Sequence, residues 1–98
     1  MFSLINDNTI IDKIKHYKSP NWIWIEIWEM SEYEIHLVVT VNHEELCHLG
    51  EHLVLHIASA DTTCAEDIAD LKRHGQKLRR VLKKGFPDSN IHSNMHYK

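Results

Sequence analysis

Three side chains suited to proton transfer or metal binding, Glu26, His36 and His56, are predicted to fall on one row of a β-sheet. A carboxylate and two imidazoles in such a row could exchange protons near neutral pH or supply part of a metal site. His52 shares a face with His56 but would lie about 13 Å away along an extended strand, too far to bind the same ion. No nucleophile or second carboxylate is fixed nearby. We therefore expect no catalytic residue and no metal ligand, and favour a histidine row within an interface.

The segment HEELCH, residues 43–48, is a second candidate for metal chemistry. On a helical turn, His43 and Cys47 are four residues apart and could both reach one ion. A structural zinc site pairs two such ligand sets from the two ends of a loop, and only one set is present here. The chain also lacks a glycine-rich phosphate loop, a G-x-S-x-G turn and an H-E-x-x-H motif. We expect no cofactor, and a His/Glu metal-dependent enzyme is the most distant of three functional alternatives.

Charge is unevenly distributed along the chain. Residues 20–71 contain no Lys or Arg and eleven carboxylates, whereas residues 72–84 contain seven basic residues and no acidic one. Basic side chains that contact phosphates release counterions, which favours binding. A nucleic-acid-binding surface on the last helix is therefore the first alternative function. Its contacts would come from four residues at near-helical spacing, Arg73, Lys77, Arg80 and Lys84.

Hydrophobic periodicity predicts the elements that position these residues. We expect a helix at 8–18, strands at 22–30, 32–41 and 51–59, a helix from Thr63 to Gly85, and a helical turn or a loop at 42–50. A turn of about three residues near Ser31 would join the first two strands as a hairpin.

Capping signals accompany both helices. The first helix would be capped by Asp7 or Asn8. The last would begin with a capping box between Thr63 and Glu66 and end at Gly85 as a left-handed residue.

The predicted fold is α+β, with element order α-β-β-β-α. The simplest arrangement places both helices on one face of a three-stranded antiparallel sheet. Residues 1–87 would form a single domain, and residues 88–98 a polar, flexible tail. The same element order occurs in double-stranded-RNA-binding domains, but the last helix here begins with an acidic turn and the analogy extends to the fold alone.

The register of the hairpin decides which polar side chains meet. If Ile27 opposes Ile35, Glu26 lies across from His36, whereas a neighbouring register would pair Glu26 with Glu34 and bring like charges together. We therefore predict the first register. A third strand paired through Leu37 and Leu55 would then place His36 opposite His56, completing the row.

The stretch NWIWIEIWEM, residues 21–30, predicts large side chains on both faces of one strand. Its isoleucines would face the helices, leaving the tryptophans on a face that two helices cannot cover. Exposed apolar patches of this kind mark interaction sites, and Trp is enriched at binding hot spots. The candidate partner-binding residues on this face are Trp22, Trp24, Glu26, Trp28, Glu34, His36, His52 and His56.

Length, composition and cysteine content bound the rest of the interpretation. The 98 residues suit one small globular domain, and two cysteines do not form a disulfide framework. We see no signal-peptide pattern and no apolar run of membrane-spanning length, and expect a cytoplasmic protein. The leading hypothesis is a small, non-enzymatic protein-binding module. It would dock through its acidic, Trp-rich sheet face onto a second copy of itself, as a homodimer, or onto a basic surface, as inhibitors, immunity proteins and antitoxins do.

Overall fold

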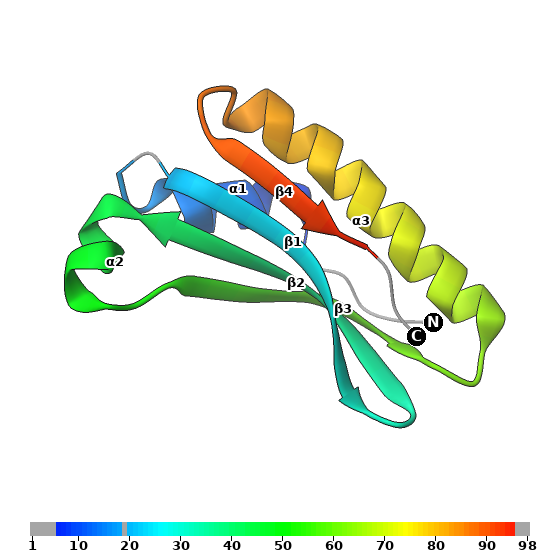
Figure 1. The fold of residues 1–98 in the computed structure, drawn as a ribbon. Coiled ribbons are helices and arrows are strands. Elements are labelled where there is room, and N and C mark those ends of the chain that lie inside the picture. Colours follow the sequence, from blue (N-terminus) through cyan, green and yellow to red (C-terminus); the bar gives the residue numbers. More distant parts are fainter. Residues whose placement is uncertain (1–5, 19, 96–98) are drawn as a thin grey trace.

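The computed structural model describes residues 6–18 and 20–95, whose arrangement is shown in Figure 1. Along the chain the elements are α1 (Asp7–Lys15), β1 (Pro20–Ser31), β2 (Glu34–His43), α2 (Glu44–Leu49), β3 (Leu53–Asp61), α3 (Ala65–Gly85) and β4 (Asn90–Asn94). The strands form one sheet in the order β3-β2-β1-β4. The β1–β2 and β2–β3 pairs are antiparallel, and β4 is parallel to β1. The α+β class is confirmed, but the sheet is mixed and four-stranded, and a third helix, α2, occupies the segment before β3.

Strand β4 is the main departure from the predicted three-stranded sheet, and it lies within the segment expected to be a polar tail. Its sequence, NIHSN, lacks the apolar alternation of a strand because an edge strand needs to bury little: Ile91 packs against the core. Two side-chain hydrogen bonds hold this region. The Arg79 Nη1 group on α3 donates to Ser93 Oγ at 2.6 Å, and Ser89 Oγ donates to the Pro20 carbonyl at 2.6 Å.

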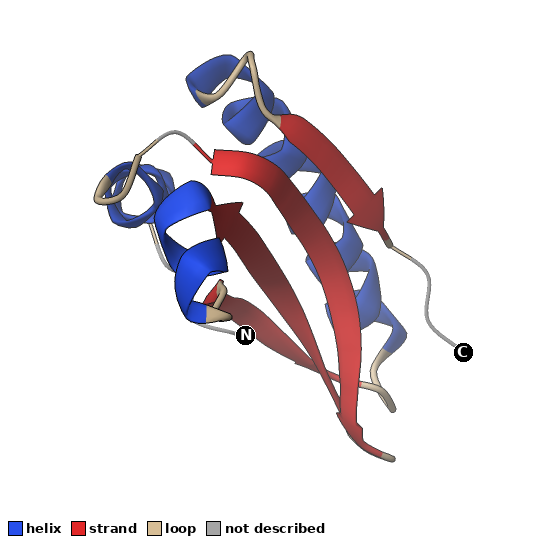
Figure 2. Ribbon diagram, turned by 60° about the vertical axis from the view of Figure 1, so that its left-hand side comes forward, coloured by secondary structure: helices blue, strands red, loops and turns tan. Residues whose placement is uncertain are grey.

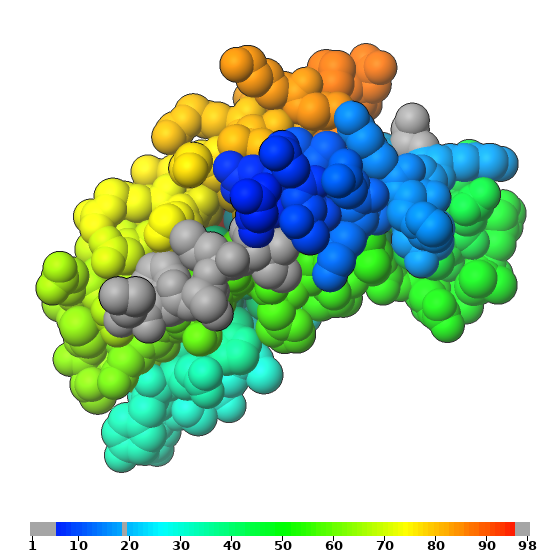
Figure 3. Space-filling model, turned by 180° about the vertical axis from the view of Figure 1, so that it is seen from behind, coloured from blue at the N-terminus to red at the C-terminus, as the bar shows by residue number. Residues whose placement is uncertain are grey.

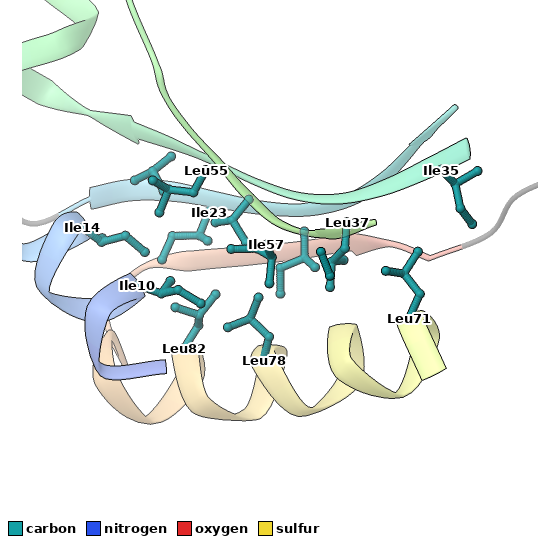
Figure 4. Packing of buried hydrophobic residues seen from close by; sticks show 14 of the residues in the cluster. Ile10, Ile14, Ile23, Ile35, Leu37, Leu55, Ile57, Leu71, Leu78 and Leu82 are labelled. Carbon is teal, nitrogen blue, oxygen red and sulfur yellow. The ribbon is translucent and has the colours of Figure 1, made fainter. Parts of the chain in front are cut away.

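Helices α1 and α3 pack on the same face of the sheet, as predicted (Figure 2). Seen from that side, α1 lies next to α3 (Figure 3). The core fills the space between the helices and the sheet, as Figure 4 shows for Ile10, Leu78 and Leu82 opposite the strands. Its fully buried members are Ile10, Ile14, Ile23, Ile25, Ile35, Leu37, Val39, Val41, Leu71 and Leu82. Burial of apolar side chains on this scale is the main contribution to the stability of the fold.

The helix ends differ from the predicted caps. The side chain of Asn6, rather than Asp7 or Asn8, caps α1 by accepting a hydrogen bond from the backbone N–H of Asn8 at 2.8 Å. Cys64 occupies the N-cap position of α3 without a side-chain hydrogen bond, so the predicted capping box is not formed.

The C-terminal end of α3 also closes differently. The backbone N–H of Phe86 donates to the Leu82 carbonyl at 2.8 Å, which satisfies one of the last carbonyls of the helix. Gly85 does not adopt a left-handed conformation. Among the described residues only Gly50, which ends α2 with φ of 73°, has a positive φ.

The hairpin register is shifted by two residues from the predicted one. Ile27 lies opposite Leu37, Glu26 opposite Val38 and Trp28 opposite His36. Ser31 pairs with Glu34, which leaves a two-residue turn, and a β-bulge between Glu29 and Ser31 accommodates one extra residue, Met30. Glu26 does not lie opposite Glu34 in either the observed or the predicted register, so charge repulsion does not distinguish the two. The turn and its bulge decide between them. The predicted Glu26–His36 pair is wrong.

A second bulge displaces β3 relative to β2. Leu37 pairs with Ala58 and Val38 with His56, so Ile57 is the extra residue of the bulge, and its side chain remains buried. His56 therefore lies opposite Val38, and His36 lies opposite Ser59. The predicted Glu26–His36–His56 row does not form, because the apolar Val38 occupies its centre.

Candidate docking face

The face of the sheet opposite α1 and α3, named here the open face, has neither helix packed on it (Figures 1 and 2). Helix α2 lies at the end of the sheet where β2 leads into β3, and Cys47 Sγ donates from it to Asn42 Oδ1. Strand alternation assigns the side chains between the core residues to the open face. They are Trp22, Trp24, Glu26 and Trp28 from β1, Glu34, His36, Val38, Thr40 and Asn42 from β2, Val54, His56 and Ser59 from β3, and Asn90, His92 and Asn94 from β4.

All eight side chains predicted to bind a partner are on or beside this face. Seven lie on its strands, and His52 immediately precedes β3. The prediction missed His92, which lies across from Trp24 in the parallel β1–β4 pair. No sequence pattern marks residue 92 as part of this face, since the strand that carries it is polar.

Three aromatic rings form a stack at the β1–β4 side of the open face. The indoles of Trp22 and Trp24 are nearly parallel, at an angle of 11°, with ring centroids 6.3 Å apart. The His92 imidazole stacks on both, with its centroid 4.6 Å from that of Trp24 and 5.3 Å from that of Trp22. The stack leaves the indoles 41% and 40% exposed. His92 therefore supports these two rings without covering them.

A second aromatic group lies towards the hairpin turn. The ring of His56 contacts Trp28 edge-on at 6.4 Å and His36 edge-on at 5.6 Å between centroids. His36 Nε2 lies 3.0 Å from Glu34 Oε1, but it is buried and has no aligned hydrogen-bond partner among the described residues. Trp28 is half-buried and less available than Trp22 or Trp24.

Val38 and Thr40 form the floor of the open face. Val38 is fully buried although neither α1 nor α3 reaches it, so the surrounding side chains of the face close over it. Beside it is a shallow hollow of about 320 Å³. The hollow is lined by Trp24, Glu26, Thr40, Asn42 and His52.

The charge of the open face comes from Glu26 and Glu34, since no Lys or Arg occurs in residues 20–71. With neutral histidines the face is acidic. The predicted nucleic-acid contacts, Arg73, Lys77, Arg80 and Lys84, are all exposed on α3, which packs on the other face. Two of them have acidic neighbours: Arg73 pairs with Asp70, and Lys77 Nζ lies 3.9 Å from Asp7 Oδ2.

The part of the chain that the structure describes has neither a cluster of metal ligands nor a membrane-spanning helix. Within residues 6–18 and 20–95, no three or more His, Cys, Asp or Glu side chains are grouped so that they could hold a metal ion. His43 is fully buried, and its Nδ1–H donates to the Lys18 carbonyl at 2.6 Å. No helix in the described part of the chain has the length and apolar character needed to span a membrane.

Comparison with known proteins supplies no further constraint: no family model, no curated protein and no solved structure matches this chain.

Proposed function

We propose that this protein binds a partner protein with a basic surface and that the open face is its docking surface. One observation carries the proposal: Trp22 and Trp24 are about 40% exposed on a sheet face that α1 and α3 leave uncovered. The exposed part of the two indoles leaves apolar surface in water, and a partner that buries it gains hydrophobic contact area.

The stacked arrangement of Trp22, Trp24 and His92 also supports a role of the exposed indoles in binding. The near-parallel indoles and His92 hold one another in place, so little side-chain freedom remains to be lost when a partner docks. Rigid aromatic anchors of this kind are typical of binding hot spots.

Charge indicates the kind of partner. Strands β1–β3 carry no Lys or Arg, and Glu26 and Glu34 lie on the open face beside the indoles. A basic surface would be attracted to this face and oriented by it, which raises the association rate. Masking of a nucleic-acid-binding or nuclease surface, as by an inhibitor, immunity protein or antitoxin, is the role that fits this combination.

The test compares the wild-type protein with a Trp22→Ala/Trp24→Ala variant and with Tyr33→Ala. Tyr33 is a matched control because it is 66% exposed at the hairpin turn, outside the open face. A protein captured by immobilised wild type is purified, and its Kd is measured by calorimetry. We expect the double variant to bind about 30-fold or more weakly, as for loss of hot-spot residues, and Tyr33→Ala to bind as wild type.

Two results would contradict the proposal: equal binding by the double variant and wild type, or a partner whose contact surface is acidic. Light scattering on the wild-type protein alone provides a further distinction. A dimer that becomes monomeric in the double variant would identify the partner as a second copy of this chain.

Nucleic-acid binding by α3 is a second candidate function. The supporting observation is that Arg80 and Lys84 are exposed on the outer side of the helix and form no ion pair with another described residue. Glu66 and Asp67 in the first turn of α3 oppose phosphate binding at that end, so contacts would come from its C-terminal half.

A further inference from the structure

The hollow on the open face is small for a ligand site. Its volume of about 320 Å³ is at the lower end of the range of ~300–1,000 Å³ found for small-molecule pockets. Its walls come from three places in the chain: Trp24 and Glu26 on β1, Thr40 and Asn42 on β2, and His52 before β3. We name it the Trp24 hollow.

Oxygen acceptors and negative charge dominate the chemistry of the Trp24 hollow. Thr40 Oγ1 is buried and has no hydrogen-bond partner among the described residues, although buried hydroxyls are normally satisfied. Asn42 Oδ1 accepts from the Cys47 thiol and retains a second lone pair.

Glu26 supplies the charge. It is half-buried between Val38 on β2 and Asn94 on β4, and no described Lys or Arg forms an ion pair with it. A half-buried carboxylate without a cation beside it favours a ligand that brings one. The exposed Trp24 indole adds a π face, which attracts the same charge.

An arginine side chain matches these features better than a lysine does. The guanidinium group is planar, offers five N–H donors, stacks on aromatic rings and is more weakly hydrated than an ammonium group. It can satisfy a carboxylate and a hydroxyl oxygen together while one of its faces rests on an indole. A lysine ammonium has three donors around a point charge and loses more hydration on entry.

We propose that the Trp24 hollow receives an arginine side chain of the basic partner. Glu26 pairs with the guanidinium, Thr40 and Asn42 accept remaining N–H groups, and Trp24 stacks on the cation. This inference rests on the proposed docking function and names the anchor that the partner supplies.

The experiment titrates the full chain with acetyl-arginine-amide and follows the indole N–H signal of Trp24 and the amide signal of Thr40 by NMR. Acetyl-citrulline-amide, of the same shape without charge, and acetyl-lysine-amide are the comparison probes. We expect saturable shifts with arginine in the millimolar range, since one side chain brings few contacts, at least about fivefold weaker binding with lysine, and none with citrulline.

Variants place the binding in the hollow. Glu26→Gln should weaken arginine binding about tenfold or more, as expected for loss of a charge-assisted bond. Glu34→Gln, which removes the same charge from the same face outside the hollow, should bind as wild type. Thr40→Val should bind more weakly, and Thr40→Ser, which keeps the hydroxyl, should retain binding. The dispersion of the NMR spectrum of Thr40→Val shows whether that variant is folded.

Three results would overturn the arginine site. They are shifts with arginine that fail to saturate, shifts that are equal in Glu26→Gln and Glu34→Gln, and shifts that the lysine probe produces at the same concentration. Because the probe needs no partner, this failure is distinct from failure of the docking proposal. A partner bound through Trp22 and Trp24 would leave docking intact even if arginine fails to bind. If the arginine probe binds but the affinity for the partner is the same in Trp22→Ala/Trp24→Ala as in wild type, only the docking proposal is overturned.

Discussion

At the scale of single residues, Asp61 shows how one carboxylate organises a turn. It ends β3, and its Oδ1 accepts hydrogen bonds from the backbone N–H of Thr63 at 2.8 Å and from Thr63 Oγ1 at 2.7 Å. These bonds favour the ionised carboxylate and lower the pKa of Asp61 below its ordinary value of 3.8, the backbone bond contributing most. The Thr63 hydroxyl is thus committed to Asp61, which explains why it does not cap α3.

The lowered pKa of Asp61 predicts the pH range in which this turn matters. Because the folded pKa is below the unfolded value of 3.8, the stabilisation is present above that value and is lost as pH falls through the folded pKa. Thr63→Val removes the hydroxyl donor but keeps the backbone N–H, so NMR titration should show the pKa of Asp61 moving part of the way back towards 3.8. Thr62→Val is the control, since Thr62 Oγ1 donates to the Glu32 carbonyl instead. An unchanged pKa in Thr63→Val would contradict this account.

At the scale of elements, α3 and β4 fit together through a glycine. Gly75 is buried on α3, and a Cβ added there would lie 1.9 Å from the Met95 Cε atom and 3.4 Å from Leu37 Cδ1. The absence of a side chain at position 75 therefore creates the space that Met95 occupies just after β4. Glycine inside a helix costs stability relative to alanine, about 1 kcal/mol, so the packing of Met95 offsets a local penalty.

A double-mutant cycle measures the coupling free energy between Gly75 and Met95. Gly75→Ala in the wild-type background should gain little or lose stability, because the new methyl group displaces the Met95 side chain. In a Met95→Ala background the same change should stabilise by up to about 1 kcal/mol, since only the gain in helix propensity remains. Chemical denaturation of the four proteins gives the coupling free energy. A coupling near zero would show that Met95 does not occupy this space.

At the scale of the whole molecule, the two faces of the sheet carry different charge. The open face and strands β1–β3 contain no Lys or Arg, whereas α3, on the other face, carries the basic segment at residues 72–84 (Figure 1). A protein with a basic surface would therefore be attracted to the open face, and a polyanion such as a nucleic acid would be attracted to the side of the molecule that carries α3. This separation allows the two candidate functions to be tested independently.

Salt titration of binding to a generic DNA duplex tests the basic side. If α3 contacts phosphates, Arg80→Ala/Lys84→Ala should lower the affinity and reduce the slope of log K against log salt by about 2, roughly one unit for each lost contact. Lys13→Ala/Lys15→Ala on α1 is the matched control, because it removes two exposed positive charges elsewhere. Equal slopes for the two variants would exclude a phosphate site on α3. Trp22→Ala/Trp24→Ala should leave duplex binding unchanged.

The sequence by itself determined the elements with strong local periodicity and the faces of the hairpin strands. The spacing of Ile68, Leu71, Leu78 and Leu82 predicts the buried side of α3, and the alternation from Trp22 to Trp28 separates indoles from isoleucines. These features follow from helix and strand geometry, which acts between residues close in sequence. Seven of the eight residues predicted for docking alternate onto the open face of their strands for the same reason.

Only the tertiary structure decided the registers, the two bulges and strand β4. A two-residue shift keeps every inward side chain inward, so alternation does not select among such registers, and the chain settles them through turns and packing across strands. β4 has almost no signal of its own because its stability comes from pairing with β1, which is far away in sequence, and from a contact with Arg79 on α3. The His92 stack on Trp22 and Trp24, and the replacement of a histidine row by Val38, both depend on these long-range pairings, which local sequence patterns do not encode.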